Sequence, residues 1–368
     1  MIKSENKITQ FQLFFIVIQS QIGIGVISLP YNVSKISKGD AWISILVAGI
    51  CISINIFLIW LLYRRFPSLT IFEMLSEIVG KHIAFLLKIT YIVYFFSAST
   101  WLILLFRRMV NIWILPRTPL WVVSFIMIAV CLYCARENLK VIARFDIVVS
   151  FLLVVLFLFI TYVIKDINYL YILPVGESGF PAIIKSAMQT TTSFFGFELL
   201  LVVFPYCLGK NAGKIKVALM ANGFVTFFYA YLTFVSLTYF GLSAIKFIPE
   251  PILYIMKFHS FQIIERTDLL FFSIWIVSVA TSFMMYLYLA SNGLACLFRE
   301  TNHSTFAFYT ASLIFVLLLF LPNNENVISV FNKYYSLASF FLVFVLPCIL
   351  LFVSVVRGKK EAPGAARS

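Results

Sequence analysis

The sequence predicts an all-α integral membrane protein with about ten transmembrane helices, and two observations support this fold class. Of the 368 residues, 62% are hydrophobic and only 12% are charged, and the mean hydropathy is +1.00. Soluble domains carry about 25% charged residues. The apolar residues also gather in runs of roughly 20, which is the length that crosses the hydrocarbon core of a bilayer. A lipid bilayer is therefore the expected environment of the chain.

The apolar runs follow one another along nearly the whole chain. In order they cover 9–30, 41–63, 83–106, 118–135, 146–164, 184–206, 217–240, 268–291, 305–321 and 330–356. They form two successive sets of five, so we expect one membrane domain (1–357) with a first repeat at 9–164 and a second at 184–356. The polar segment 358–368 is expected to be a short cytoplasmic tail.

Local signals refine the ends of several elements. Thr9 followed by Gln12 is typical of a helix capping box. The Pro-Glu-Pro at 249–251 predicts the start of a short helix at the membrane surface. Arg107 and Arg108 are expected to extend from the end of their span toward water. Lys and Arg are modestly more frequent in the loops that share a side with both termini, which predicts that both termini are cytoplasmic.

Several function classes are disfavoured. The net charge of +13 resides in short clusters between apolar runs, and not in a basic stripe with interleaved aromatic residues, so no nucleic-acid partner is expected. The histidines His82, His259 and His303 do not accompany a cysteine or carboxylate in a catalytic pattern. The pair Cys131 and Cys134 has no second pair or histidine cluster to form a metal site. We expect no enzyme activity, no catalytic residue, no metal site and no cofactor.

The first apolar run contains two glycines, Gly23 and Gly25, followed by Pro30. A glycine inside a helix costs about 1 kcal/mol relative to alanine, but it allows the backbone to unwind and a ligand to approach closely. Unwound backbone at membrane depth occurs only where it lines a cavity or is buried in protein. The alternative interpretation is that these glycines only permit close helix packing.

The sixth run contains a second unusual stretch, in which hydroxyl residues at 190–193 precede Gly196 and the acidic Glu198. An ionisable side chain at this depth is expensive and indicates function. Glu198 either contacts a ligand, acts as a protonatable latch between helices, or pairs with a buried donor as a purely structural group. Runs one and six open the two sets of five, and interruptions at matching places in two halves are the best sequence pointer to a transporter substrate site.

These stretches together predict a ligand-binding site near the bilayer midplane. The backbone and side chains expected to form it are Gln21, Ile22, Gly23, Ile24, Gly25, Val26, Thr192, Ser193, Phe195, Gly196 and Glu198. Polar residues at helical spacing in two other runs would supply the walls, namely Tyr94, Ser97, Ser278, Thr281 and Ser282. Such polar faces also serve plain helix packing, so the walls have a structural alternative.

The segments Gly23 to Pro30 and Phe195 to Glu198 resemble the helix-one and helix-six signatures of the amino acid–polyamine–organocation transporter superfamily. Within it, the chain resembles the B subunit of the nutrient-germinant receptors of endospore-forming bacteria. The features that carry this likeness are Ser4 to Thr9, Gly80-Lys81, Gly179, Pro205, Glu265-Arg266 with Asp268, and Trp275. Thr267 departs from the pattern, where a bulky aromatic residue is expected.

The resemblance implies a LeuT-type fold with five-plus-five inverted repeats and interrupted helices 1 and 6. It also implies a complex with an A subunit and a lipoprotein C subunit in the spore inner membrane, in which this subunit senses a small nutrient such as an amino acid. Two other functions stay open: a proton- or sodium-coupled amino acid transporter, and an assembly scaffold whose cavity is vestigial.

Overall fold

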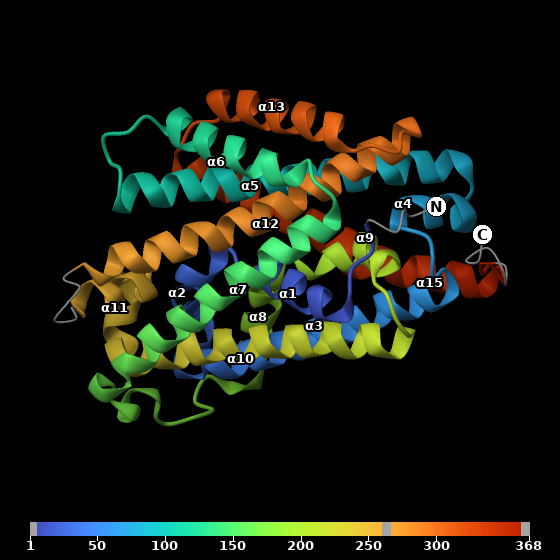
Figure 1. Ribbon diagram of the computed structural model, residues 1–368. Coiled ribbons are helices and arrows are strands. Elements are labelled where there is room, and N and C mark those ends of the chain that lie inside the picture. The colour runs from blue at the N-terminus through green and yellow to red at the C-terminus, as the bar shows by residue number, and fades with distance from the viewer. Residues whose placement is uncertain (1–5, 260–265, 362–368) are drawn as a thin grey trace.

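The computed structural model describes residues 6–259 and 266–361, which are almost entirely helical. Long helices lie side by side in one bundle (Figure 1). The helices of the first half are α1 (Gln10–Gln21), α2 (Leu29–Ser37), α3 (Ala41–Arg65), α4 (Ile71–Val79), α5 (Lys81–Trp113), α6 (Leu120–Ala135) and α7 (Leu139–Tyr162). Those of the second half are α8 (Gly179–Thr190), α9 (Leu200–Val203), α10 (Asn211–Ala244), α11 (Pro251–Phe258), α12 (Thr267–Phe298), α13 (Ser304–Phe320), α14 (Glu325–Ser339) and α15 (Leu346–Val356).

Membrane-spanning length is reached by six continuous helical segments in the described part of the chain. A bent pair, Gly179–Phe194 with Phe197–Tyr206, would make a seventh span. The apolar helices α6 and α13 are shorter, at 16 and 17 residues. Each predicted run contains helix, and the predicted division into repeats 9–164 and 184–356 stays a prediction. Of the residues that carry the family likeness, Ser4, Glu5 and Glu265 lie outside the described residues.

Helix ends show where local signals succeed and fail. The capping box of α1 is confirmed, because the Thr9 amide donates to Gln12 Oε1 at 2.9 Å and the Gln12 amide donates to Thr9 Oγ1 at 3.2 Å. The short helix α11 begins at Pro251, as the sequence predicts. The prediction for Arg107 was wrong. Its side chain is buried, and its two terminal nitrogens donate to the carbonyls of Leu318 and Leu321 at 2.7 Å each.

The centre of the bundle holds α1, which packs against α7, α10 and α12. The end of the bundle where α1 begins and α15 ends is called the terminal face here, and the end where α11 lies is called the distal face (Figure 1). At the terminal face, Ile8 pairs with the end of span six, since its amide donates to Tyr206 O at 2.9 Å and its carbonyl accepts from Leu208 N at 2.8 Å.

The C-terminal part of the chain has two further features. Residues Phe340–Val345 form a π-helical stretch that joins α14 to α15 without a break. The last turn of α15 and the segment after it dock onto the end of α3, where Arg65 donates to the carbonyls of Ser354 and Lys359 at 2.9 and 3.0 Å. The described part of the predicted tail therefore packs against the bundle.

Candidate ligand-binding site

The first span is interrupted where the glycines predict it. Helix α1 ends at Gln21 and α2 begins at Leu29, and a short 3₁₀ turn, Ile24–Ile27, lies between them. Gly23 introduces this turn with a φ of −122° and a ψ of −137°, outside helical geometry. The first turn of α2 follows at Ser28, whose side chain makes no capping hydrogen bond. The amide end of α2 thus begins in the middle of the bundle.

The sixth span is interrupted at Gly196, and its two parts meet at an angle of 58°. Gly196 has a φ of +123°, which side chains of L-residues rarely adopt. A Cβ atom at this position would also overlap the backbone carbonyl of Ser20. A glycine is therefore required at this position for two reasons, the backbone conformation and the close contact with α1. The two interruptions lie directly against each other.

Gln21 fastens the first interruption to its neighbours. Its Nε2 donates to Phe194 O at 3.0 Å and to Asn222 Oδ1 at 3.1 Å. Its own backbone carbonyl accepts a hydrogen bond from the Tyr229 hydroxyl at 2.6 Å. These bonds connect the end of α1 to both the sixth span and α10, so the broken backbone is held in one geometry.

A cavity of about 560 Å³ lies against the two interruptions. Gly23, Gly25 and Ser193 line it there, which we call its base, and Trp101 forms part of its wall. Its lining also includes Lys35 and an ion pair in which Arg108 Nη2 is 2.8 Å from Glu325 Oε1. Among the described residues, the charged side chains of the lining are Lys35, Arg108 and Glu325, while the base offers backbone and hydroxyl groups.

Glu198 lies behind the cavity wall and is fully buried. Its Oε1 accepts hydrogen bonds from the hydroxyls of Tyr94, at 2.9 Å, and Tyr286, at 2.5 Å. Its Oε2 accepts from the Gly196 amide at 2.7 Å. Tyr286 lines the cavity and Glu198 does not. The carboxyl group thus joins the sixth span to α5 and α12 at one point.

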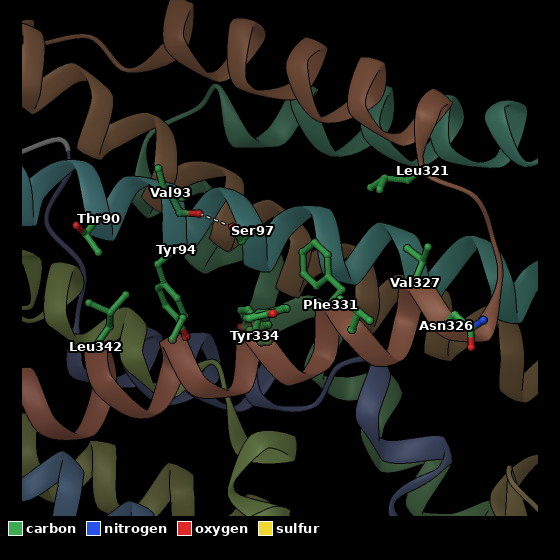
Figure 2. A pocket seen from close by; sticks show the side chains of 13 residues that line it. Thr90, Val93, Tyr94, Ser97, Leu321, Asn326, Val327, Phe331, Tyr334 and Leu342 are labelled. Atoms are coloured by element: carbon green, nitrogen blue, oxygen red, sulfur yellow. Dashed lines mark hydrogen bonds between the residues drawn. The ribbon is translucent and has the colours of Figure 1, made fainter.

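An apolar groove of about 600 Å³ lies between α5 and α14, next to the cavity (Figure 2). The Ser97 hydroxyl lies there and donates to its own helix at Val93 O, 2.7 Å away. The rings of Tyr94 and Tyr335 stack with centroids 5.7 Å apart. Tyr335 lines both hollows, so this stacked pair is part of the partition between the groove and the cavity.

The predicted site residues fall into two groups. Those that line the cavity are Gln21, Gly23, Ile24, Gly25, Thr192, Ser193, Phe195 and Ser282. The others lie outside it. Ile22, Val26 and Ser278 surround a small apolar hollow beside Trp275, and Thr281 forms a hydrogen bond with Gln19. Tyr94 and Ser97 line the groove, and Gly196 and Glu198 lie behind the cavity wall.

Several cavity residues were not anticipated, including Trp101, Tyr286, Asn332 and Tyr335. Tyr286 had a usable signal, because it lies four residues after Ser282 and therefore on the same helical face. Trp101 and Tyr335 had none, since a chain with 41 phenylalanines and 18 tyrosines leaves aromatic spacing uninformative.

Two helices broken against each other around a cavity define the class of LeuT-type transporter folds, and solved structures agree. MhsT in complex with L-phenylalanine superposes with a TM-score of 0.71 at 16% identity, covering 97% of this chain and 91% of that one. The nucleobase-cation-symport-1 family transporter Mhp1, in a closed conformation with bromovinylhydantoin bound, gives 0.68 at 14% identity, covering 96% and 79%. The predicted all-α membrane protein with a LeuT-type fold is confirmed, and the count of about ten spans and the inverted repeat stay predictions.

The chain belongs to the spore germination protein family, whose model matches residues 7–328. It is 27% identical to spore germination protein YndE of Bacillus subtilis (strain 168), over 98% of this chain and 100% of the relative. It is 25% identical to spore germination protein GerQB of Bacillus cereus, over 96% and 98%. It is 26% identical to spore germination protein A2 of Bacillus subtilis (strain 168), over 95% and 96%. The family predicted from the sequence is confirmed, and the chain is a multi-pass membrane protein.

Proposed function

We propose that this chain is the nutrient-sensing subunit of a spore germinant receptor, and that a small zwitterionic molecule such as an amino acid binds in the cavity. The observation that carries this proposal is the base of the cavity, where both helix interruptions meet. A volume of about 560 Å³ is within the range of small-molecule sites. One protein of the same fold has a structure that contains L-phenylalanine.

The two ends of an amino acid need opposite partners. The amide end of α2 carries roughly half a positive charge and begins at Ser28, which lines the cavity, so it suits a carboxylate. The 3₁₀ turn Thr191–Phe194 follows α8 and places Thr192 and Ser193 at the cavity. Hydroxyl and carbonyl oxygens there suit an ammonium group.

Glu198 is proposed to act as a latch and not as a direct ligand contact. Tyr286 lines the cavity and bonds the carboxyl group behind it, so a ligand that moves this ring changes a bond shared by three spans. A ligand shifts a conformational equilibrium only if it binds one state more tightly. The response would pass to A and C partner subunits in the spore inner membrane, with both termini cytoplasmic.

The decisive experiment uses spores that lack only this chain, screened with single amino acids and sugars. We expect the germination response to one nutrient to disappear and to return when the gene is restored. An unchanged response to every nutrient that germinates the parent spores would refute the sensor function. That the chain is not an enzyme also stays a prediction.

A proton- or sodium-coupled amino acid transporter is the second candidate, and a specific observation favours it. A polar cavity of about 280 Å³ lies at the terminal face, lined by Tyr206, Tyr288 and Asn292 among others. Hollows on either side of the helix interruptions suit alternating access to one central site. Robust counterflow of the nutrient found in the screen, measured in vesicles that contain the chain alone, would support transport, and its absence would favour the sensor.

A further inference from the structure

A second buried carboxyl group lies outside the cavity, on α7. Asp146 is 1% exposed. Among the residues that the structure describes, neither of its side-chain oxygens has a hydrogen-bond partner. Burying an isolated carboxylate ion costs far more than burying a neutral carboxylic acid. Asp146 therefore belongs in this structure as the neutral, protonated acid.

Glu198 shows the contrast inside the same bundle. Three donors surround its carboxyl group, two tyrosine hydroxyls and one backbone amide. Hydrogen bonds to a charged form favour that form, and a site without donors favours the neutral one. The donors around Glu198 therefore favour its charged form, and their absence around Asp146 favours the neutral acid there.

A chain of hydrogen bonds joins the turn that carries Asp146 to the cavity wall. The Ser150 hydroxyl donates to the Asp146 carbonyl at 2.7 Å and accepts from Gln19 Nε2 at 3.0 Å. On the other side of Gln19, its Oε1 lies 3.2 Å from the Thr281 hydroxyl, and its carbonyl accepts from the Ser282 hydroxyl at 2.9 Å. Ser282 lines the cavity. The seam between α1 and α7 is thus bonded directly to the ligand site.

The helices packed against α7 leave Asp146 with little charge around it. Helix α1 has no titratable side chain. From α6, Cys134 is the group that interacts electrostatically with Asp146. The titratable groups of α12 make contacts elsewhere: Asp268 pairs with Arg266, Tyr286 with Glu198 and Tyr288 with Asn292, and Cys296 lines the terminal cavity. Those of α10 also have other neighbours: Lys214 contacts Phe204, Tyr229 contacts Gln21, Tyr231 contacts Thr161 and Tyr239 contacts His259. Lys216, near the start of α10, has no electrostatic interaction with Asp146.

We propose that Asp146 is a proton-binding site that is occupied in this state and that releases its proton to water when α1 tilts away from α7 at the terminal face. Helix α1 is a separate piece of 12 residues, because the interruption after Gln21 detaches it from α2. Opening the seam between α1 and α7 would admit water to the carboxyl group. The O–H bond of the acid would then break heterolytically, and the proton would pass to a water molecule. Coupling to a ligand rests on the proposed function, whereas proton binding does not.

Infrared spectroscopy of the purified full-length chain in lipid nanodiscs tests the protonation state without a ligand. We expect a carbonyl stretching band of a neutral carboxylic acid at neutral pH, lost in Asp146→Asn and kept in Glu198→Gln. If wild type and Asp146→Asn give the same spectrum in this region, Asp146 is ionised and the site does not exist. Asp146→Ser replaces the Asp146→Asn variant if the latter does not fold.

The coupled motion is tested at Cys207, which is buried beside Ile8 at the terminal face. Burial raises the pKa of its thiol to about 11. A water-soluble maleimide would be reacted with two chains in which Cys207 is the only cysteine. One chain keeps Asp146, and the other carries Asp146→Asn and no further change. The readout is the ratio of the two labelling rates at each pH, because the reagent and the thiol titrate equally in both chains.

Raising the pH removes the proton from Asp146 and favours the open seam, whereas Asp146→Asn imitates the protonated acid at every pH. We therefore expect the labelling rate of the chain with Asp146, divided by that of the Asp146→Asn chain, to rise several-fold from acidic to alkaline pH. Ser150→Ala in the chain with Asp146 should keep the infrared band and reduce this rise. A ratio that stays constant with pH would overturn the coupling.

Discussion

Tyr286 Oη lies 2.5 Å from Glu198 Oε1, and this contact joins the wall of the cavity to the buried carboxyl group behind it. The tyrosine belongs to α12 and the glutamate to the broken sixth span. A change of ring position on the cavity side therefore alters the polar group that holds the sixth span.

Glu198→Gln should weaken the nutrient response while the protein still reaches the membrane. The amide would present a donor where the carboxylate accepts three hydrogen bonds. Hydrogen bonds to charged groups contribute about 1.5–3 kcal/mol, so the nutrient concentration for half-maximal germination should rise about tenfold or more. Glu77→Gln, at an exposed carboxyl on α4, is the matched control. Identical dose–response curves for both variants would remove Glu198 from the mechanism.

Gly25→Leu should abolish the response without lowering the amount of protein in the membrane. The new side chain would enter the base of the cavity, where a Cβ atom at Gly25 lies 3.6 Å from the Ser193 side chain. Gly25→Ala should have a smaller effect, because 3.6 Å is an ordinary contact distance. The measurement is germination of spores that carry each variant, with the amount of protein in the membrane determined by immunoblotting.

The control for this series is Gly223→Leu, because a Cβ atom at Gly223 meets no atom of the described residues within 4 Å. Gly49 is unsuitable, since a side chain there would overlap Thr226. Normal germination with Gly25→Leu would show that the cavity is vestigial and would favour the scaffold function.

Acidification should destabilise the chain through His303, at the start of α13. Burial lowers the pKa of this imidazole below its usual value, and Nε2 lies 3.1 Å from the Ala135 carbonyl. The folded state therefore favours the neutral ring. This contribution to stability is complete above the ordinary histidine pKa of about 6.5 and is lost as the pH falls through the lowered value of the folded state.

Thermal unfolding in detergent measures this effect. The midpoint of the wild type should fall more steeply on acidification than that of His303→Gln, whose amide can still donate to Ala135. His82→Gln, at an exposed histidine, should follow the wild type. Parallel curves for all three chains would mean that His303 does not limit stability in acid.

The sequence predicts the positions of both helix interruptions because glycine is costly inside a helix and is placed where geometry demands it. Gly196 is the clearest case, with its φ of +123° and its contact with Ser20. The all-α membrane class follows from the length of the apolar runs, whereas the LeuT-type fold was implied by the family resemblance. These are properties of the backbone and of solvation, which local sequence records directly.

The side chains that face the cavity were harder to predict because their direction depends on the rotation of each helix. Ser282 lines the cavity, whereas Ser278, one turn earlier on the same helix, lies beside an apolar hollow. Arg107 is buried because carbonyls at the end of α13 accept its hydrogen bonds, and that partner is distant in sequence. Helix α4 is too short to span a membrane, so hydropathy did not reveal it.

The π-helical stretch Phe340–Val345 has a consequence for what the last span can tolerate. A π-bulge accommodates extra chain within a helix, and one residue corresponds to a rotation of about 100°. Tyr335 before the bulge lines the cavity, while the Ser354 carbonyl after it accepts from Arg65. Deleting one residue inside the stretch would convert it to an ordinary α-helical turn and leave both ends in place. Deleting one residue elsewhere between Tyr335 and Ser354 would turn one of these groups away from its partner, so the bulge is the place where this span tolerates a change of length.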